Sequence, residues 1–174
     1  MAVYTKINKQ NILNIENNFN FGKIIQFYGI KKGIENTNYL IKTKNKKYIL
    51  TIFEKRVQTK NLPFFMNLMS GLSKLKIKCP KPLKNKKGVY LFKIKNKFGC
   101  LVTFLKGTDK SELNNNDCYV IGKNVAKLHR ASKRLNIYRK NTLSVKSLGG
   151  ILKKIDKRIN KLSKNLIVSM ENEI

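Results

Sequence analysis

The sequence has few of the residues on which several kinds of site depend. Its 174 residues include no tryptophan, three prolines, three cysteines and one histidine, His129. The cysteines, Cys79, Cys100 and Cys118, show no CxxC spacing and have no neighbouring histidine. A zinc site and a disulfide framework are therefore not expected, and three reduced thiols in a cytoplasmic protein are the better interpretation.

Long apolar segments are also missing. No uninterrupted apolar stretch approaches the roughly 18 residues that a membrane-spanning helix needs. The N-terminal sequence MAVYTKINKQNILN lacks the apolar core and the small-residue cleavage site of a signal peptide. We therefore expect a soluble protein of the cytoplasm that has no membrane partner. The length suits one domain with a substantial core, or a small lobe plus the start of another.

Acidic residues are scarce. Nine Asp and Glu stand against 38 Lys and Arg, which gives a formal net charge of +29. Such a surface attracts nucleic acids and other polyanions without specificity. Nearly all the cations are lysines, however, and abundant Asn and Ile accompany them, as expected when an AT-rich genome biases codon use. Because specific nucleic-acid binders favour arginine, compositional drift is preferred over selected binding, and both interpretations stay open.

Five segments have the pattern of β-strands. Two of them alternate between apolar and polar residues, and the short connection between these two suits a hairpin. The predicted strands cover residues 23–28, 37–43, 48–53, 89–94 and 100–104. We predict that they form one antiparallel sheet, in which residues 95–99 make the turn of the second hairpin.

Apolar residues recur at helical spacing in other segments. Helices are predicted over residues 7–18 and over 61–75, where Pro63 suits a first turn. Residues 114–117 supply caps for a third helix, and a fourth covers about 148–168. The apolar seam of the fourth suits either a two-stranded coiled coil or, as we prefer, the remainder of its own domain.

Two residues of these last helices invite a functional interpretation. No aspartate follows His129 at the second position, so we expect this histidine to pack at the helix end rather than to act in catalysis. Asp156 lies among lysines that would pair with it, which makes it a poor metal ligand.

The predicted buried side of the third helix consists of Cys118, Ile121, Val125 and Leu128. The segment Cys79-Pro80-Lys81-Pro82 must be extended.

Several segments together resemble one family. In sequence order they are MAVYT, GIENTNYLI, YILTIFEKRV, LPFFMNLMSGL, CPKP and LVTFLKG. They resemble the bacterial homoserine kinases of the aminoglycoside-phosphotransferase-like superfamily, and IGKNVAKLHRAS and NTLSV resemble the start of its large lobe. The resemblance implies an α+β fold. A protein-kinase-like small lobe, with an inserted helix, would cover residues 1–104, a hinge 105–113, and the first helices of a truncated helical large lobe 114–174.

The resemblance implies transfer of the ATP γ-phosphate to the hydroxyl of L-homoserine in threonine biosynthesis, with Mg²⁺ required. The loop at residues 29–38 would cover the phosphates, although an ordinary hairpin turn has the same pattern, and residues 103–105 would bind adenine through the backbone. Thr51 replaces the usual third-strand lysine, and Lys55 is either a substitute or a solvated lysine. The predicted nucleotide-binding residues are Gly29, Gly33, Asn36, Asn38, Thr51, Lys55, Thr103 and Leu105.

Carboxylates for phosphoryl transfer are missing from the expected positions. The predicted helix over 61–75 has Ser70 where an acid is expected, and none of the nine acids lies in an H-x-D-x-x-x-x-N or D-x-x motif. No catalytic residue or metal ligand is therefore assigned. We expect an N-terminal fragment that is inactive alone, with a separate chain as one candidate source of the large lobe. The alternative is a non-catalytic basic protein that binds nucleotides or nucleic acids on a kinase-like lobe.

Overall fold

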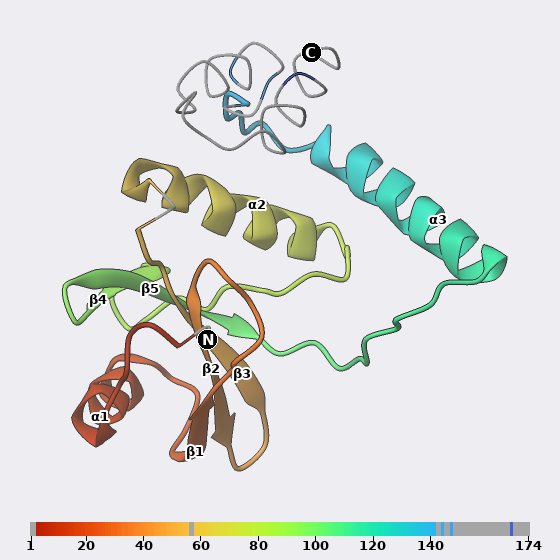
Figure 1. The fold of residues 1–174 in the computed structure, drawn as a ribbon. Helices are drawn as coiled ribbons and strands as arrows, with labels where there is room; N and C mark the ends of the chain where they lie inside the picture. The colour runs from red at the N-terminus through yellow and green to blue at the C-terminus, as the bar shows by residue number, and fades with distance from the viewer. Residues whose placement is uncertain (1–2, 56–57, 142–143, 145–146, 148–167, 169–174) are drawn as a thin grey trace. The chain divides into compact units, whose positions relative to one another are not determined.

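The computed structural model describes residues 3–55, 58–141, 144, 147 and 168 (Figure 1). The chain divides into two compact units, residues 1–137 and 138–174, and the helices and strands named below belong to the first. In the second unit the Ser147 amide donates a hydrogen bond to the Ser144 carbonyl oxygen at 2.9 Å. Apart from its last residue, the predicted helix over 148–168 lies outside the described residues, as does Asp156.

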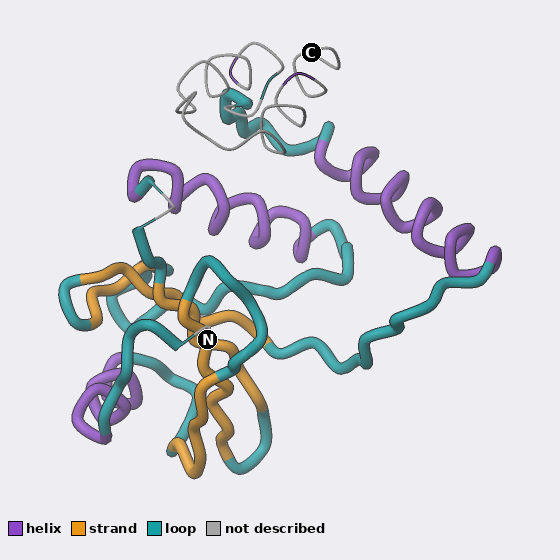
Figure 2. Tube along the Cα trace, viewed as in Figure 1, coloured by secondary structure: helices purple, strands orange, loops and turns teal. Residues whose placement is uncertain are grey.

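The predicted sheet of five antiparallel strands is confirmed (Figure 2, orange). Its strands lie in the order β1-β2-β3-β5-β4. Their bounds are β1 (Ile24–Gly29), β2 (Thr37–Thr43), β3 (Lys47–Ile52), β4 (Leu91–Ile94) and β5 (Lys97–Thr103). The first three lie within one residue of their predicted bounds, because clear alternation and short connections mark them in the sequence.

The turn between β4 and β5 is shorter than predicted. It consists of Lys95 and Asn96, whose φ angles are 46° and 61°. Residues 97–99 therefore belong to β5, and residues 89–90 precede β4. Positive φ at both central residues gives a turn that matches the twist of the two strands. The prediction was wrong because no glycine occupies either turn position, although glycine is the usual sign of such a turn.

One face of the sheet is covered by α1 (Lys9–Asn18). The helix predicted over residues 7–18 is confirmed, but it begins two residues later than predicted. The helix begins with a capping box, in which the Asn11 amide donates to Asn8 Oδ1 at 3.0 Å and the Asn8 amide donates to Asn11 Oδ1 at 3.1 Å. The core on this face has as its buried members Ile12, Ile15, Phe19, Tyr39, Ile41, Tyr48, Leu50, Ile52, Ile94 and Leu101.

The opposite face of the sheet is covered by α2 (Leu62–Lys74), which follows the short 3₁₀ turn η1 (Thr59–Asn61). Met66 of α2 packs in a second core cluster with Cys100 and Val102 of β5, whereas Leu101 between them belongs to the first cluster. Because successive side chains of a strand point to opposite faces, α1 and α2 lie on different sides of the sheet (Figure 1).

The segment that connects α2 to β4 is extended at its prolines, as predicted. Pro82 pairs with Val102 as an isolated antiparallel bridge, and the Leu83 amide donates to the Leu101 carbonyl oxygen at 2.9 Å. The segment therefore lies along β5. This position brings Lys81 next to the end of β5, where the chain leaves the sheet.

The third helix, α3 (Asn115–Ser132), begins where predicted but does not bury the predicted side. Asn114 caps it, since the Asp117 amide donates to Asn114 Oδ1 at 2.9 Å. Cys118, Ile121 and Val125 are exposed, however, and the last two side chains expose 47% and 43% of their surface. An apolar stripe shows which side of a helix needs cover. A hollow of about 610 Å³ separates that side from residues 76–79.

The packing of α3 begins only at its C-terminal end. Leu128 is half-buried and Ala131 is buried, and the Leu135 side chain lies 2.8 Å from the position that a Cβ at Gly71 of α2 would occupy. His129 is exposed, so the prediction that it packs at the helix end was wrong. None of the helices within the described residues is both long and apolar enough to cross a membrane.

Candidate functional site

A cleft of about 540 Å³ opens between α2 and the face of β3 and β5 that α2 covers. Among its lining residues, Thr51 of β3 and Thr103 of β5 are the ones that carry hydroxyl groups. The remainder are Ile49, Phe53, Phe65, Met66, Leu68, Met69, Pro80, Cys100, Val102, Phe104 and Leu105. An apolar slot with a few polar groups suits a flat ring that hydrogen-bonds at its edge.

Cys100 forms part of the wall of this cleft. Its side chain is buried between Met66 and Val102, and this burial raises the pKa of the Cys100 thiol to about 12. The thiol therefore stays protonated near neutral pH. Because the thiolate is the nucleophile in cysteine chemistry, Cys100 contributes shape to the cleft and no covalent step.

The end of β5 forms one edge of the cleft, and most of its backbone donors are already bonded. The Thr103 amide donates to the Lys81 carbonyl oxygen at 2.9 Å, and the Phe104 amide donates to the Lys47 carbonyl oxygen at 3.2 Å. Thr103 Oγ1 accepts from the Lys81 amide at 2.9 Å. Within the residues that the structure describes, the Leu105 amide has no acceptor. The Leu105 amide is therefore a backbone donor that remains for a ligand at this edge.

Residues 29–38, called the glycine loop below, connect β1 to β2. The Ile30 amide donates to the Asn38 carbonyl oxygen at 2.8 Å and closes the base of the loop. Gly33 has a φ of 113°, which only glycine adopts without strain. Neither Asn36 nor Asn38 has a positive φ. Their side chains bond across to β3 and its end instead.

Asn38 and Thr51 form a polar pair beside the apolar lining. The Thr51 hydroxyl donates to Asn38 Oδ1 at 2.8 Å, because the register of β2 and β3 places these two residues opposite each other. Thr51 lines the cleft. The sequence placed Thr51 where many kinases carry a lysine, and here that position holds a neutral side chain whose partner is an amide.

Lys55 does not join the other predicted residues. Its side chain is exposed and lines a separate hollow of about 260 Å³, together with Thr59 and Lys97. In α2, Ser70 stands where an acid was expected, and its hydroxyl lies 2.9 Å from the Tyr90 hydroxyl. The lining of the cleft includes no charged side chain. This lining therefore offers no lysine–glutamate pair to a ligand.

Gly29 serves a purpose that the sequence did not suggest. A Cβ at this position would lie 2.7 Å from Val3 Cγ2, closer than carbon atoms approach without displacement. The glycine therefore makes room for the N-terminal segment. No contact of this kind supports the prediction that Gly29 belongs to the nucleotide-binding residues.

Glu54 is the polar residue near the loop that sequence reasoning missed. Its carboxylate accepts hydrogen bonds from the Thr5 hydroxyl at 2.6 Å, from the Thr37 hydroxyl at 2.7 Å, and from the Lys97 ammonium. Its amide donates to Asn36 Oδ1 at 3.3 Å. Burial by itself raises the pKa of the Glu54 carboxyl, but the hydrogen bonds from Lys97, Thr5 and Thr37 and the Lys97 charge together hold it below its ordinary value. The sequence contained one signal for Glu54. It is one of only nine acids in the chain, and it directly follows the strand predicted over residues 48–53.

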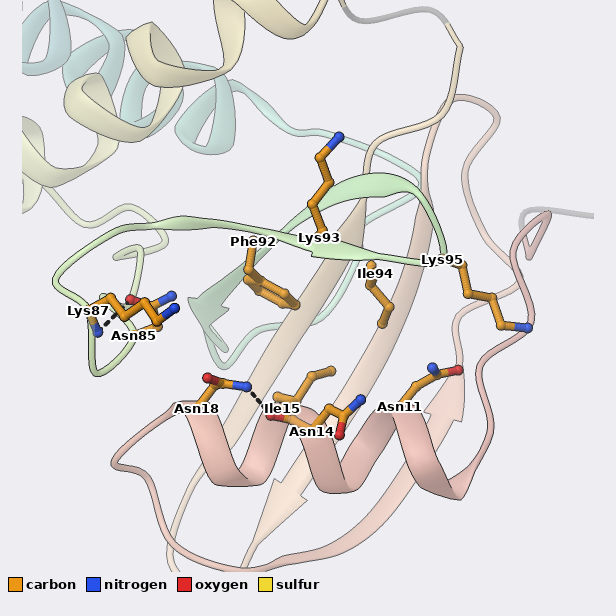
Figure 3. A pocket seen from close by; sticks show the side chains of 10 residues that line it. All are labelled: Asn11, Asn14, Ile15, Asn18, Asn85, Lys87, Phe92, Lys93, Ile94 and Lys95. Carbon is orange, nitrogen blue, oxygen red and sulfur yellow. Dashed lines mark hydrogen bonds between the residues drawn. The ribbon is translucent and has the colours of Figure 1, made fainter.

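A further hollow, of about 270 Å³, lies on the other face of the sheet beside α1 (Figure 3). Three of the asparagines that line it already bond to the local backbone. Asn11 belongs to the capping box of α1, Asn18 Nδ2 donates to the Asn14 carbonyl oxygen at 2.7 Å, and Asn85 Oδ1 accepts from the Lys87 amide at 3.0 Å. We therefore interpret this hollow as a groove between structural elements.

A metal site does not emerge from the described residues. They include no group of three or more His, Cys, Asp or Glu side chains that could hold an ion. Mg²⁺ is held by oxygen ligands, usually one or two carboxylates together with substrate phosphates, and no carboxylate lines the cleft. The described residues thus do not fit a protein-held Mg²⁺.

Solved structures of phosphotransferases share this fold. A spectinomycin phosphotransferase, in complex with ADP and spectinomycin, is similar with a TM-score of 0.60 at 15% identity, over 97% of this chain and 54% of that protein. An aminoglycoside phosphotransferase from Alicyclobacillus acidocaldarius gives a TM-score of 0.61 at 11% identity, over 97% of this chain and 50% of that one. These likenesses define a phosphotransferase fold of the protein-kinase-like type.

Sequence similarity specifies the family. Residues 27–154 match the phosphotransferase enzyme family, and the chain belongs to it. The homoserine kinase of Methylorubrum populi is 37% identical over 83% of this chain and 45% of the relative. The homoserine kinase of Agrobacterium fabrum is 34% identical over 100% of this chain and 54% of the relative. The chain spans about half the length of the curated relatives it matches.

Proposed function

We propose that this chain supplies the nucleotide-binding lobe of a homoserine kinase, an enzyme that transfers the γ-phosphate of ATP to the hydroxyl of L-homoserine. The observation that carries the proposal is the apolar cleft of about 540 Å³ between α2 and the sheet. Curated relatives at 32–37% identity have that name. A phosphotransferase of the same fold was crystallised with ADP, which supports a nucleotide as the ligand of the cleft.

In this proposal each part of the cleft has a distinct task. The adenine ring lies between Val102 and the α2 side chains, and the Leu105 amide donates to a ring nitrogen. The glycine loop presents backbone amides to the phosphates, which is a common use of glycine-rich loops. Asn38 and Thr51 offer neutral hydrogen-bonding groups in place of a lysine. The described residues do not fit Mg²⁺, so no step is assigned to it.

The proposal includes binding without turnover by the 174-residue chain. Phosphoryl transfer needs an aspartate to orient the attacking hydroxyl, and no carboxylate lines the cleft. We expect the purified chain to form no ADP from ATP and L-homoserine above the rate of a heat-denatured sample. Homoserine-dependent ADP formation, measured with a coupled assay, would contradict this expectation.

Nucleotide binding is tested by filling the cleft. Ile49 lines it, whereas Ile25 of β1 is 58% exposed and does not. Ile49→Phe should weaken binding of a fluorescent ADP analogue at least about tenfold, which corresponds to about 1.4 kcal/mol. Ile25→Phe introduces the same side chain and should bind as the unmodified chain does. Equal affinity of the two variants, or no binding by the unmodified chain at millimolar concentration, would contradict the proposal.

A second candidate function is binding of polyanions through lysines. A hollow of about 480 Å³ at the β2–β3 turn is lined by lysines without any carboxylate, and they are Lys42, Lys44, Lys46, Lys47 and Lys106. Such a site would bind single-stranded nucleic acid with an affinity that falls steeply as salt rises. The test compares removal of these five lysines with removal of five lysines elsewhere on the chain. An equal loss of affinity in the two cases would instead favour diffuse electrostatic attraction.

A further inference from the structure

The segment ahead of α1, residues 3–7, is called the strap below because it lies across the base of the glycine loop. The amides of Tyr4 and Thr5 both donate to Thr37 Oγ1, each at 3.0 Å. The Tyr4 hydroxyl donates to the Ile34 carbonyl oxygen at 3.0 Å. The strap therefore holds the loop at its base and also beyond it, next to Gly33.

The strap is itself fixed to the sheet. The Tyr39 hydroxyl accepts from the Ile7 amide at 3.2 Å and donates to the Thr5 carbonyl oxygen at 3.1 Å. Val3 occupies the space that the missing side chain of Gly29 leaves free. Contacts thus run along the full length of the segment, which binds to both ends of the glycine loop.

Thr37 is the residue at which these bonds converge. It has no exposed surface, and while it accepts two strap amides its hydroxyl donates to Glu54 at 2.7 Å. Glu54 also receives the Thr5 hydroxyl, and Lys97 bridges the two, with its ammonium 2.7 Å from Thr5 Oγ1. Because Thr37 is fully buried, loss of its hydroxyl would leave the two strap amides without an acceptor and without water to replace it.

From this geometry we infer that the strap, through Thr5, Thr37 and Glu54, is a positioning device that holds the glycine loop in the conformation that receives the nucleotide phosphates. The identity of the ligand in this inference rests on the proposed function. The statement that the strap holds the loop does not depend on it. A loop that must be ordered on binding lowers affinity by the free energy of ordering it. A loop that is already held in place does not lower the affinity in this way.

The position of the strap in the chain supports a role added to the common fold. The match to the phosphotransferase enzyme family begins at residue 27, after the strap and α1. The similarity to the homoserine kinases of Gluconobacter oxydans and Agrobacterium fabrum covers 100% of this chain, the strap included. The strap therefore lies outside the family match, whereas its partners Thr37 and Glu54 lie inside it, and all of them fall within the span shared with those relatives.

The experiment compares two buried threonines of β2. Thr37→Val removes the acceptor of both strap amides, and Thr37→Ser restores it. Thr43→Val is the matched control, because Thr43 is 4% exposed and its hydroxyl donates to the Lys46 carbonyl oxygen at 3.1 Å, at the other end of the strand. Thr5→Val removes the bonds that the Thr5 hydroxyl makes to Glu54 and to Lys97 but leaves both strap amides bonded to Thr37, so it is the milder variant should Thr37→Val fail to fold.

Two measurements are made on each variant of the full chain: hydrogen exchange of amides 30–36 and the affinity for a fluorescent ADP analogue. We expect Thr37→Val to raise loop exchange and to weaken ADP binding, each at least about tenfold, with a smaller change in the same direction for Thr5→Val. Thr37→Ser should lie within about threefold of the unmodified chain. Thr43→Val should lower thermal stability without either effect.

Each result decides the matter. If Thr37→Val exchanges and binds as Thr43→Val does, the strap does not position the loop. If the loop exchanges faster but ADP affinity is unchanged, the strap holds the loop without serving the nucleotide, and the inference is overturned. If the unmodified chain binds no ADP, the proposed function fails, and loop exchange alone then decides whether the strap holds the loop.

Discussion

Glu54→Gln isolates the charge in the network below the glycine loop. Glutamine has the size of glutamate but no charge, so Thr5 and Thr37 lose a charged acceptor and Lys97 loses its counter-ion. The Glu54 side chain is only 10% exposed, whereas that of Lys97 is 38% exposed. Water therefore screens one partner of the ion pair but hardly reaches the other.

These exposures set the size of the expected effect. Hydrogen bonds to charged groups contribute about 1.5–3 kcal/mol each, and a fully buried ion pair that loses one partner costs about 3–5 kcal/mol. Because Lys97 reaches solvent and glutamine keeps part of the bonding, we expect Glu54→Gln to lower the free energy of unfolding by about 1.5–3 kcal/mol at pH 7.

The pH dependence follows from the lowered pKa of the Glu54 carboxyl. The ordinary value is 4.5 and the folded value lies below it. The stabilisation is therefore complete above pH 4.5 and is lost as pH falls through the lower folded value. Between pH 6 and 3 the unmodified chain should lose more stability than Glu54→Gln. The two free energies should converge at the acid end.

Urea unfolding followed by far-ultraviolet circular dichroism measures both effects, since the chain has no tryptophan to report by fluorescence. Asp109→Asn is the control. Asp109 pairs with Lys32 at 2.6 Å, but both side chains are more than 80% exposed, so no measurable change is expected. The reasoning is refuted if Glu54→Gln is as stable as the unmodified chain at pH 7, or if the two pH profiles run parallel.

Three further predictions concern the backbone, the thiols and the core. Gly29→Ala should displace Val3 and raise hydrogen exchange in the strap, because the new Cβ would lie 2.7 Å from Val3 Cγ2; unchanged exchange would contradict this. Cys118 should react with a thiol reagent at least about tenfold faster than Cys100, whose pKa burial raises to about 12, as peptide mapping of the labelled chain would show. Leu50→Ala, at a position with no exposed surface, should cost about 2–5 kcal/mol in urea unfolding, and a change below about 1 kcal/mol would be inconsistent with close packing there.

The predictable part of the fold is the part that short-range pattern determines. The alternation of β2 and β3 follows from residues that are close in sequence, and it sets the register that pairs Asn38 with Thr51. The cap at Asn114 is likewise local. The exposed side of α3 was not predictable in this way, because an apolar stripe identifies the side that needs cover and says nothing of whether cover is present.

The site was predictable to a similar degree. Thr51, Thr103 and Leu105 all line the cleft, because a hairpin and the strand beside it place them there. Lys55 does not, since strand parity cannot be continued past the last residue of β3. Glu54 was missed because its partners lie 17, 43 and 49 residues away in the chain, and no local pattern encodes contacts at that range.

The close fit of Val3 against Gly29 has a practical consequence for how the protein is prepared. A purification tag joined to the amino terminus would introduce foreign residues directly beside the segment that holds the loop. Affinities measured on amino-terminally tagged material should therefore be repeated after proteolytic removal of the tag.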